Sequence, residues 1–322
     1  MSLEQELYDS IMNELSSASF PLMDREELIE ALMTGPQATY KAGQSQLEIP
    51  GIADLLIEKD FPLHDARMAA EAICERAGFC FLKLRGMSCA NLSRYDEAIR
   101  YFDRSLIYHP EDTDALLGKA SALNRMGFFS ESLKVIKSIY QINRSSPEAW
   151  YLNGTILLQR GDIKEAIVCL DEAVKLDPGY IEALSSSGNC RYYLGDYQEA
   201  IDRYDQIIAI NRSYPKAWYN KGVVLSEVRQ YNEALRCYEE VLQINPGVAS
   251  VWTNKGYCLA MLDKYNEALE SFDIALNINP EDALALNNKA AALHRMGLED
   301  EAAELAERVI DLTTGKGNHT VI

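Results

Sequence analysis

Apolar residues recur three and four positions apart in short segments throughout residues 79–312. Within residues 147–178 two such stripes lie on either side of Gly161-Asp162. The first stripe consists of Ala149, Trp150, Leu157 and Leu158, and the second of Ile163, Ala166, Ile167, Leu170, Ala173 and Val174. This spacing predicts two helices. Gly161 supplies the turn between them, since glycine tolerates a positive φ. Pro178 ends the second helix, because proline has no N–H and disfavours helix in the residue before it.

The same pattern returns at a fixed interval along the chain. Glycines stand 34 residues apart at Gly154, Gly188, Gly222 and Gly256, and alanines do so at Ala166, Ala200, Ala234 and Ala268. Such a period predicts a stack of like helical hairpins, in which each hairpin covers the apolar face of the one before. Seven units fit end to end, and they begin at Phe79, Thr113, Pro147, Ile181, Pro215, Ala249 and Ala283.

Small residues carry the predicted packing within each hairpin. Gly154 and Ala166 lie on facing helices, and their lack of bulk lets the two helices approach closely. Trp150 and Leu170 then fill the space above and below. A stack of this kind leaves an open trough, which favours a binding surface over a catalytic pocket.

The repeated residues resemble the tetratricopeptide repeat (TPR) family over residues 79–312. The resemblance rests on Trp150, Gly154, Gly161, Ala166, Ala173 and Pro178 in one unit, and on Trp252, Gly256, Tyr265, Ala268, Phe272, Ala275 and Pro280 in another. It implies an all-α, right-handed superhelical solenoid whose first helices line an inner groove for a protein or peptide partner. The last unit departs from the pattern with the charged run Glu299-Asp300-Glu301, which suits a terminal cap. Residues 313–322 have no periodicity and are predicted to be a flexible tail.

The sixth position of the last three units holds asparagine, at Asn220, Asn254 and Asn288. Each amide offers a donor and an acceptor to an extended backbone, and the resemblance supports this role. The alternative is that these asparagines are simply solvated. Further candidates on the first helices are Asn189, Lys216, Tyr219, Tyr257, Asn287 and Arg295. Tyr204, Tyr238 and Tyr265 are interpreted as hairpin core.

One specialised form of the groove is not expected. Repeats that grip a terminal carboxylate of heat-shock chaperones combine asparagines with three cations on successive first helices. Asn189 and Asn220 fit that set, but Ser185, Ser250 and Asn254 stand where the cations belong. Without them a carboxylate loses its charge-assisted partners.

Residues 1–78 lack the repeat and form an acidic segment, with 15 Asp and Glu against 5 Lys and Arg. The phrase Phe-Pro-Leu occurs at 20–22 and 61–63, and helices are predicted near 3–17, 24–33, 51–58 and 64–77. Thr39 to Lys41 and Leu47 to Ile49 are predicted to pair as a short ribbon. The segment resembles a small EF-hand-like domain of uncharacterised proteins from methane-producing archaea, which implies an archaeal source and brings no known activity.

Composition and motifs narrow the function. Calcium is not expected, because 34–48 holds a single acid and 54–65 has no central glycine. The net charge of −18 opposes nucleic acid as a partner. Seven scattered cysteines indicate buried reduced thiols and no zinc site. No enzyme signature, cofactor motif, signal segment or membrane-spanning run occurs, so a non-enzymatic cytoplasmic protein is predicted.

The preferred hypothesis is an adaptor or scaffold that binds a peptide or helix of a partner in the groove. One alternative is a regulatory subunit or assembly factor that binds an enzyme complex through residues 1–78. Another is a small-ligand sensor in residues 1–78 coupled to the array. The oligomeric state stays open, because an uncapped end of a repeat stack can pair with a copy of itself.

Overall fold

The computed structural model describes residues 38–42, 45–49 and 82–314. The chain divides into two compact units, residues 1–149 and 150–322, and each is described by itself. The helices predicted at 3–17, 24–33, 51–58 and 64–77 lie outside the described residues, and so does the segment 54–65 that was considered for calcium. Most of the other such segment, 34–48, is described and forms two strands.

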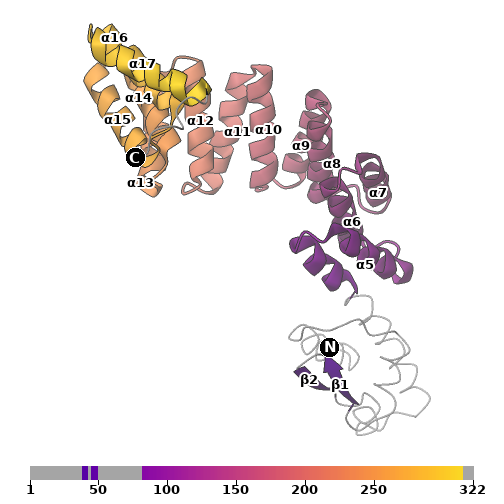
Figure 1. Cartoon of the computed structure of the whole chain (residues 1–322). Helices are drawn as coiled ribbons and strands as arrows, with labels where there is room; N and C mark the ends of the chain where they lie inside the picture. Colours follow the sequence, from indigo (N-terminus) through magenta and orange to yellow (C-terminus); the bar gives the residue numbers. More distant parts are fainter. Residues whose placement is uncertain (1–37, 43–44, 50–81, 315–322) are drawn as a thin grey trace, which may run out of the picture. The chain divides into compact units, whose positions relative to one another are not determined.

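In the first unit, the described residues form an antiparallel ribbon and five helical segments (Figure 1). Strands β1 (Ala38–Ala42) and β2 (Ser45–Ile49) pair with Thr39 opposite Glu48 and Lys41 opposite Gln46. This confirms the predicted ribbon. A helix at 82–91 is followed by α5 (Tyr95–Tyr108), α6 (Thr113–Arg125), α7 (Phe129–Ile142) and the start of α8 (Pro147–Gln159).

The second unit continues the hairpins along the chain. After α8 come α9 (Ile163–Leu176), α10 (Ile181–Leu194), α11 (Tyr197–Ile210), α12 (Pro215–Glu227), α13 (Tyr231–Ile244), α14 (Ala249–Met261), α15 (Tyr265–Ile278), α16 (Ala283–Arg295) and α17 (Glu299–Thr314). Each helix from α9 on contacts the next one. Across residues 82–314 the two units hold seven hairpins, so the all-α repeat fold is confirmed.

A left-handed residue closes the turn inside every hairpin. Glycine holds this place at Gly127, Gly161, Gly195 and Gly297, with φ between 80° and 84°, and three other residues hold it at Ser93, Arg229 and Asp263, with φ of 59° to 62°. Glycine adopts this conformation without the Cβ penalty of other residues. The turn role predicted for Gly161 is therefore confirmed.

The links between hairpins are closed by short polar side chains. Asn211 Oδ1 accepts from Ser213 N at 3.0 Å, and the same turn recurs at Asn143, Asp177, Asn245 and Asn279. Asp112 and Asp282 cap the following helices by accepting two backbone N–H groups each. These side chains satisfy amides that the helix itself leaves unpaired.

Five of the seven hairpins within residues 82–314 pack a glycine of the first helix against a large side chain of the second, and Ala120 and Ala290 hold this position in the other two. A Cβ on Gly188 would lie 2.9 Å from Tyr204, one on Gly222 would lie 2.7 Å from Tyr238, and Gly154 meets Leu170 in the same way. Ala166, Ala200, Ala234 and Ala268 are fully buried. The predicted placement of the small residues is thus correct.

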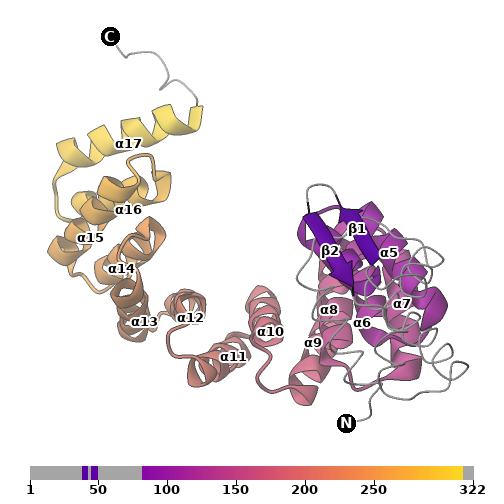
Figure 2. The same ribbon diagram turned by 90° about the horizontal axis from the view of Figure 1, so that it is seen from below.

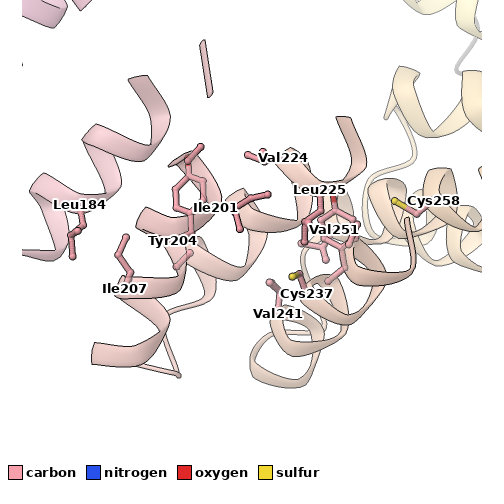
Figure 3. Close-up of a cluster of buried hydrophobic side chains, with 14 of the residues drawn as sticks. Leu184, Ile201, Tyr204, Ile207, Val224, Leu225, Cys237, Val241, Val251 and Cys258 are labelled. Atoms are coloured by element: carbon pink, nitrogen blue, oxygen red, sulfur yellow. The ribbon is translucent and has the colours of Figure 1, made fainter. Parts of the chain in front are cut away.

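The core of the second unit runs through the array between successive helices. Figure 3 shows its labelled members on five consecutive helices: Leu184, Ile201, Tyr204, Ile207, Val224, Leu225, Cys237, Val241, Val251 and Cys258. The partly buried Trp218 and Trp252 pack against this cluster. Their indole N–H groups donate to Arg212 O and Pro246 O, each at 2.8 Å. In this part of the array the apolar surface of one hairpin is therefore covered by the next.

Candidate functional site

The first helices of successive hairpins form one row in the second unit. Helix α10 contacts α12, α12 contacts α14, and α14 contacts α16. These helices are labelled in Figure 2. The predicted asparagines Asn220, Asn254 and Asn288 lie on the last three of these helices and are all half-buried. Their side chains are therefore partly open to solvent along this row.

Two of the predicted residues are joined by a hydrogen-bonded chain that reaches into the core. The buried Tyr204 hydroxyl donates to Asn189 Oδ1 at 2.7 Å, and Asn220 Nδ2 donates to the same oxygen at 3.1 Å. Burial raises the pKa of the Tyr204 hydroxyl, so it stays protonated and remains a donor. The Asn189 side chain is thus held by Tyr204 of its own hairpin and by Asn220 of the next hairpin.

A second contact links the following pair of first helices. Asn254 Nδ2 donates to the Tyr219 hydroxyl at 3.3 Å, and the Tyr219 ring lies 6.3 Å from the ring of Tyr238. An amide has two donor hydrogens and one acceptor oxygen, so Asn220 and Asn254 each keep an oxygen and one N–H. Against the described residues, the side chains of Asn287 and Asn288 make no hydrogen bond.

A pocket opens between α8, α9 and α10 in the second unit. It has a volume of about 310 Å³ and is lined by Leu158, Gly161, Ile163, Ser186, Asn189, Cys190 and Tyr193. Most of these side chains are apolar, and Ser186 and Asn189 provide the polar groups. Burial raises the pKa of the Cys190 thiol to about 11, so it is a weak nucleophile and serves as an apolar wall.

Tyrosines gather beside this pocket. The Tyr192 ring lies 5.6 Å from that of Tyr193 and 6.0 Å from that of Tyr197, and Tyr193 is 75% exposed. Tyr257, one of the predicted residues, meets Tyr231 edge-on at 6.3 Å. Sequence reasoning missed Tyr192 and Tyr193, although two adjacent tyrosines on a first helix were a visible signal.

The remaining predicted residues lie apart from these contacts. Lys216 and Arg295 are exposed at opposite ends of their helices, in the first turn of α12 and the last of α16. The expectation of a core position is confirmed for Tyr204 and Tyr238, which are buried, and in part for Tyr265, which packs against a core cluster from its edge. Tyr265 is the first residue of α15 and only half-buried, because it lies beside the turn, where its hydroxyl donates to Asp263 at 2.6 Å.

Within residues 82–314 the groups described above offer hydrogen bonds and apolar contacts. These residues contain no group of three His, Cys, Asp or Glu side chains that could hold a metal ion. Five cysteines in this part of the chain are free and buried. Exposed amides, phenols and an apolar pocket can bind a polypeptide by hydrogen bonds and burial of side chains.

Family models match three parts of the chain. Residues 215–248 and 249–282 each match the tetratricopeptide repeat, and 188–228 match a TPR repeat. The chain carries tetratricopeptide repeats. Residues 91–173 match the family of anaphase-promoting complex, cyclosome, subunit 3. Residues 6–75 match the MTH865-like family, which confirms the separate resemblance of the N-terminal segment; the archaeal source stays a prediction.

Individual proteins are similar over the repeats. The CTR9 homolog of Arabidopsis thaliana is 36% identical over 90 residues, 28% of this chain and 8% of that protein. A MamA double mutant of Desulfovibrio magneticus RS-1 is 25% identical, with a TM-score of 0.51 over 53% of this chain and 96% of that one. PilF of Pseudomonas aeruginosa is 20% identical, with a TM-score of 0.52 over 63% and 92%. The chain spans at most 32% of the length of its curated relatives.

The TPR fold is typically a non-enzymatic scaffold, and TPR proteins bind protein or peptide partners. Among the described residues, no helix has the length and apolar character needed to cross a membrane. The cytoplasmic location stays a prediction.

Proposed function

We propose that this TPR array is an adaptor whose first helices bind an extended segment or a helix of a partner protein. The observation that carries the proposal is the row of half-buried amides and phenols on α10, α12 and α14. Hydrogen bonds across hairpins hold these groups in place, yet they keep unused donors and acceptors. A rigid surface of this kind loses little conformational entropy when a segment binds along it.

In this proposal the asparagines differ in how many of their hydrogen-bonding groups are left for the partner. Asn220 and Asn254 each donate one N–H within the protein, and in this proposal their side-chain oxygens bind backbone N–H groups of the partner. Asn288 keeps its full capacity toward a ligand. The pocket beside Asn189 and Tyr193 would take one apolar side chain of the bound segment, because its volume of about 310 Å³ exceeds that of a single large side chain.

Affinity capture with the full chain tests this function. The groove variant carries Asn220→Ala and Asn254→Ala. Its matched control carries Asn232→Ala and Asn266→Ala, which remove exposed asparagines from the second helices of the same hairpins. We expect the groove variant to lose the captured partner and the control to keep it, with both variants shown by circular dichroism to melt cooperatively.

The two alternatives give different results in the same experiment. Equal capture by both variants contradicts the groove. If removal of residues 1–78 then abolishes capture, the partner binds through that segment, as a regulatory subunit or assembly factor would. A small-ligand sensor in residues 1–78 would instead melt at a higher temperature when its ligand is added.

A further inference from the structure

Ion pairs join successive hairpins at one repeated position. An acid in the middle of a second helix pairs with a lysine on the first helix of the next hairpin, 16 residues further along the chain. Four such pairs, with N–O distances of 2.5 to 3.7 Å, are Asp103 with Lys119, Asp205 with Lys221, Glu239 with Lys255 and Asp273 with Lys289. Asp171 holds the same place and accepts from Ser187, whereas α7 carries Lys137 there. The acid and its partner therefore belong to the contact by which one hairpin stacks on the next.

The last second helix, α17, carries this acid without a partner. Glu307 stands 34 residues after Asp273, is exposed, and makes no ion pair with any residue that the structure describes. An apolar residue one turn further on is uncovered as well. Ile310 is 57% exposed, whereas Leu242 and Val174, at the same place in internal hairpins, are 9% and 8% exposed. Helix α17 thus presents one half of the contact that joins internal hairpins.

The first helix of the array, at 82–91, carries the other half. Arg85 holds the place of the lysine in its unit, is half-buried, and makes no ion pair within the described part of the chain. Ser88 lies one turn further on the same face and is exposed, and Leu92, just beyond the helix, is 66% exposed. At the place of Ser88 on the next first helix, Ala122 is only 1% exposed, because it packs into the core of the preceding hairpin.

The two ends of the array are therefore complementary in charge. A cation stands at one end and an anion at the other, at the two positions that pair between internal hairpins, and each has an exposed apolar side chain nearby. A contact between two α17 helices is disfavoured, because α17 carries six acids and one arginine and like charges that face each other repel. The matching surface for α17 is thus the 82–91 helix of another copy.

We propose that α17 of one copy binds the 82–91 helix of a second copy, with Glu307 paired to Arg85, so that chains associate head to tail. The apolar side chains supply most of the affinity, because a partly exposed ion pair contributes little. The ion pair selects the partner and the register. A contact between two different surfaces can repeat, so species larger than dimers are expected. This inference concerns the ends of the array and does not depend on the proposed groove function.

Sedimentation velocity of the full chain tests the inference, at a physiological salt concentration that screens the net charge of −18 beyond about 8 Å. The variants are Glu307→Arg and Arg85→Glu. The control, Glu301→Arg, makes the same charge change on α17 at a place where Glu199 and Glu233 of internal hairpins are exposed and make no ion pair with described residues. We expect the wild type and the control to form larger species as the concentration rises. Each variant should need at least about tenfold more protein to do so, because like charges would face each other.

An equimolar mixture of the two variants separates a lost contact from a lost fold. The Glu307→Arg copy keeps Arg85 and the Arg85→Glu copy keeps Glu307, so each supplies the charge that the other needs, and the mixture should regain the association of the wild type. Circular dichroism melts show that both variants are folded. A wild type that stays monomeric at every concentration overturns the inference. So do single variants that associate as strongly as the wild type, or a mixture of folded variants that stays monomeric.

Discussion

Two adjacent hairpins, α10–α11 and α12–α13, share their packing and differ in their polar contacts. Gly188 meets Tyr204 in one as Gly222 meets Tyr238 in the other. The Tyr204 hydroxyl donates to Asn189, whereas the buried Tyr238 hydroxyl has no hydrogen-bond partner among the described residues. The residue 34 positions after Asn189 is Val223, which cannot accept. The repeat period thus fixes the shape of the hairpin, while its polar contacts vary from copy to copy.

The ion pairs between hairpins show the same contrast. Lys221 pairs with Asp205 at 2.5 Å, and Lys119 and Lys289 make the equivalent pair with Asp103 and Asp273. Ser187 stands where the lysine would be on α10, and there Asp171 accepts instead from Ser187, Arg191 and Arg203. A charged contact between the second helix of one hairpin and the first helix of the next is therefore present in each case, but different residues make it.

The largest loss in the free energy of unfolding should come from changing the glycine–tyrosine contact that the two hairpins share. Gly188→Val and Gly222→Val would each place side-chain atoms where tyrosine rings lie. Overpacking typically costs about 1–3 kcal/mol and occasionally more, and we expect the upper end or more here because a Cβ alone would lie 2.9 or 2.7 Å from the ring. Both variants should lose similar amounts in urea unfolding followed by circular dichroism. A cost confined to one of them would show that the two hairpins do not pack alike.

The next largest loss of stability should differ between the charged contacts of the two hairpins. Asp171→Asn removes the charge that holds two arginines and a serine, and hydrogen bonds to charged groups contribute about 1.5–3 kcal/mol. Asp205→Asn removes one partly exposed ion pair, which contributes under about 1 kcal/mol. Denaturation midpoints in low and high salt measure both. Equal losses would mean that the Asp171 contacts add nothing beyond a surface pair.

The helices and their order could be predicted from the sequence because they follow from local periodicity. The expected units from Thr113 to Ala283 begin where α6, α8, α10, α12, α14 and α16 begin. The small residues could be placed because a glycine or alanine that recurs every 34 residues indicates a close approach of two helices in each hairpin. These features need no knowledge of contacts between hairpins.

The site could be predicted only in part, since its polar contacts cross hairpins. The bonds from Asn220 to Asn189 and from Asn254 to Tyr219 span 31 and 35 residues. Their partners stand at the ninth position of one unit and the fifth of another, so no single period reveals them. Tyr265 was grouped with Tyr204 and Tyr238, although it stands seven positions earlier in its unit, and it therefore packs at the edge of a core cluster and not inside it.

A smaller effect should distinguish the two buried phenols. Tyr204→Phe leaves Asn189 without one donor and should cost about 1 kcal/mol. Tyr238→Phe removes a hydroxyl that has no partner, so its stability should be unchanged or slightly higher. Val223→Asn would supply the missing acceptor and should restore the contact seen at Tyr204. Thermal melting of the three variants checks this, and an equal loss for both phenylalanine variants would contradict the comparison.

The smallest effect is a loss of stability at alkaline pH that both hairpins share. Burial raises the pKa of Cys190 and of Cys237 to about 11, from an ordinary value of 9.0. The folded state thus holds these protons more tightly than the unfolded state. Their contribution to stability is complete below pH 9 and is lost as the pH rises through about 11. Cys190→Ala and Cys237→Ala should each reduce the fall in melting temperature between pH 8 and pH 10.5 under reducing conditions. A fall that neither variant changes would assign the alkaline loss to other groups, such as the buried tyrosines.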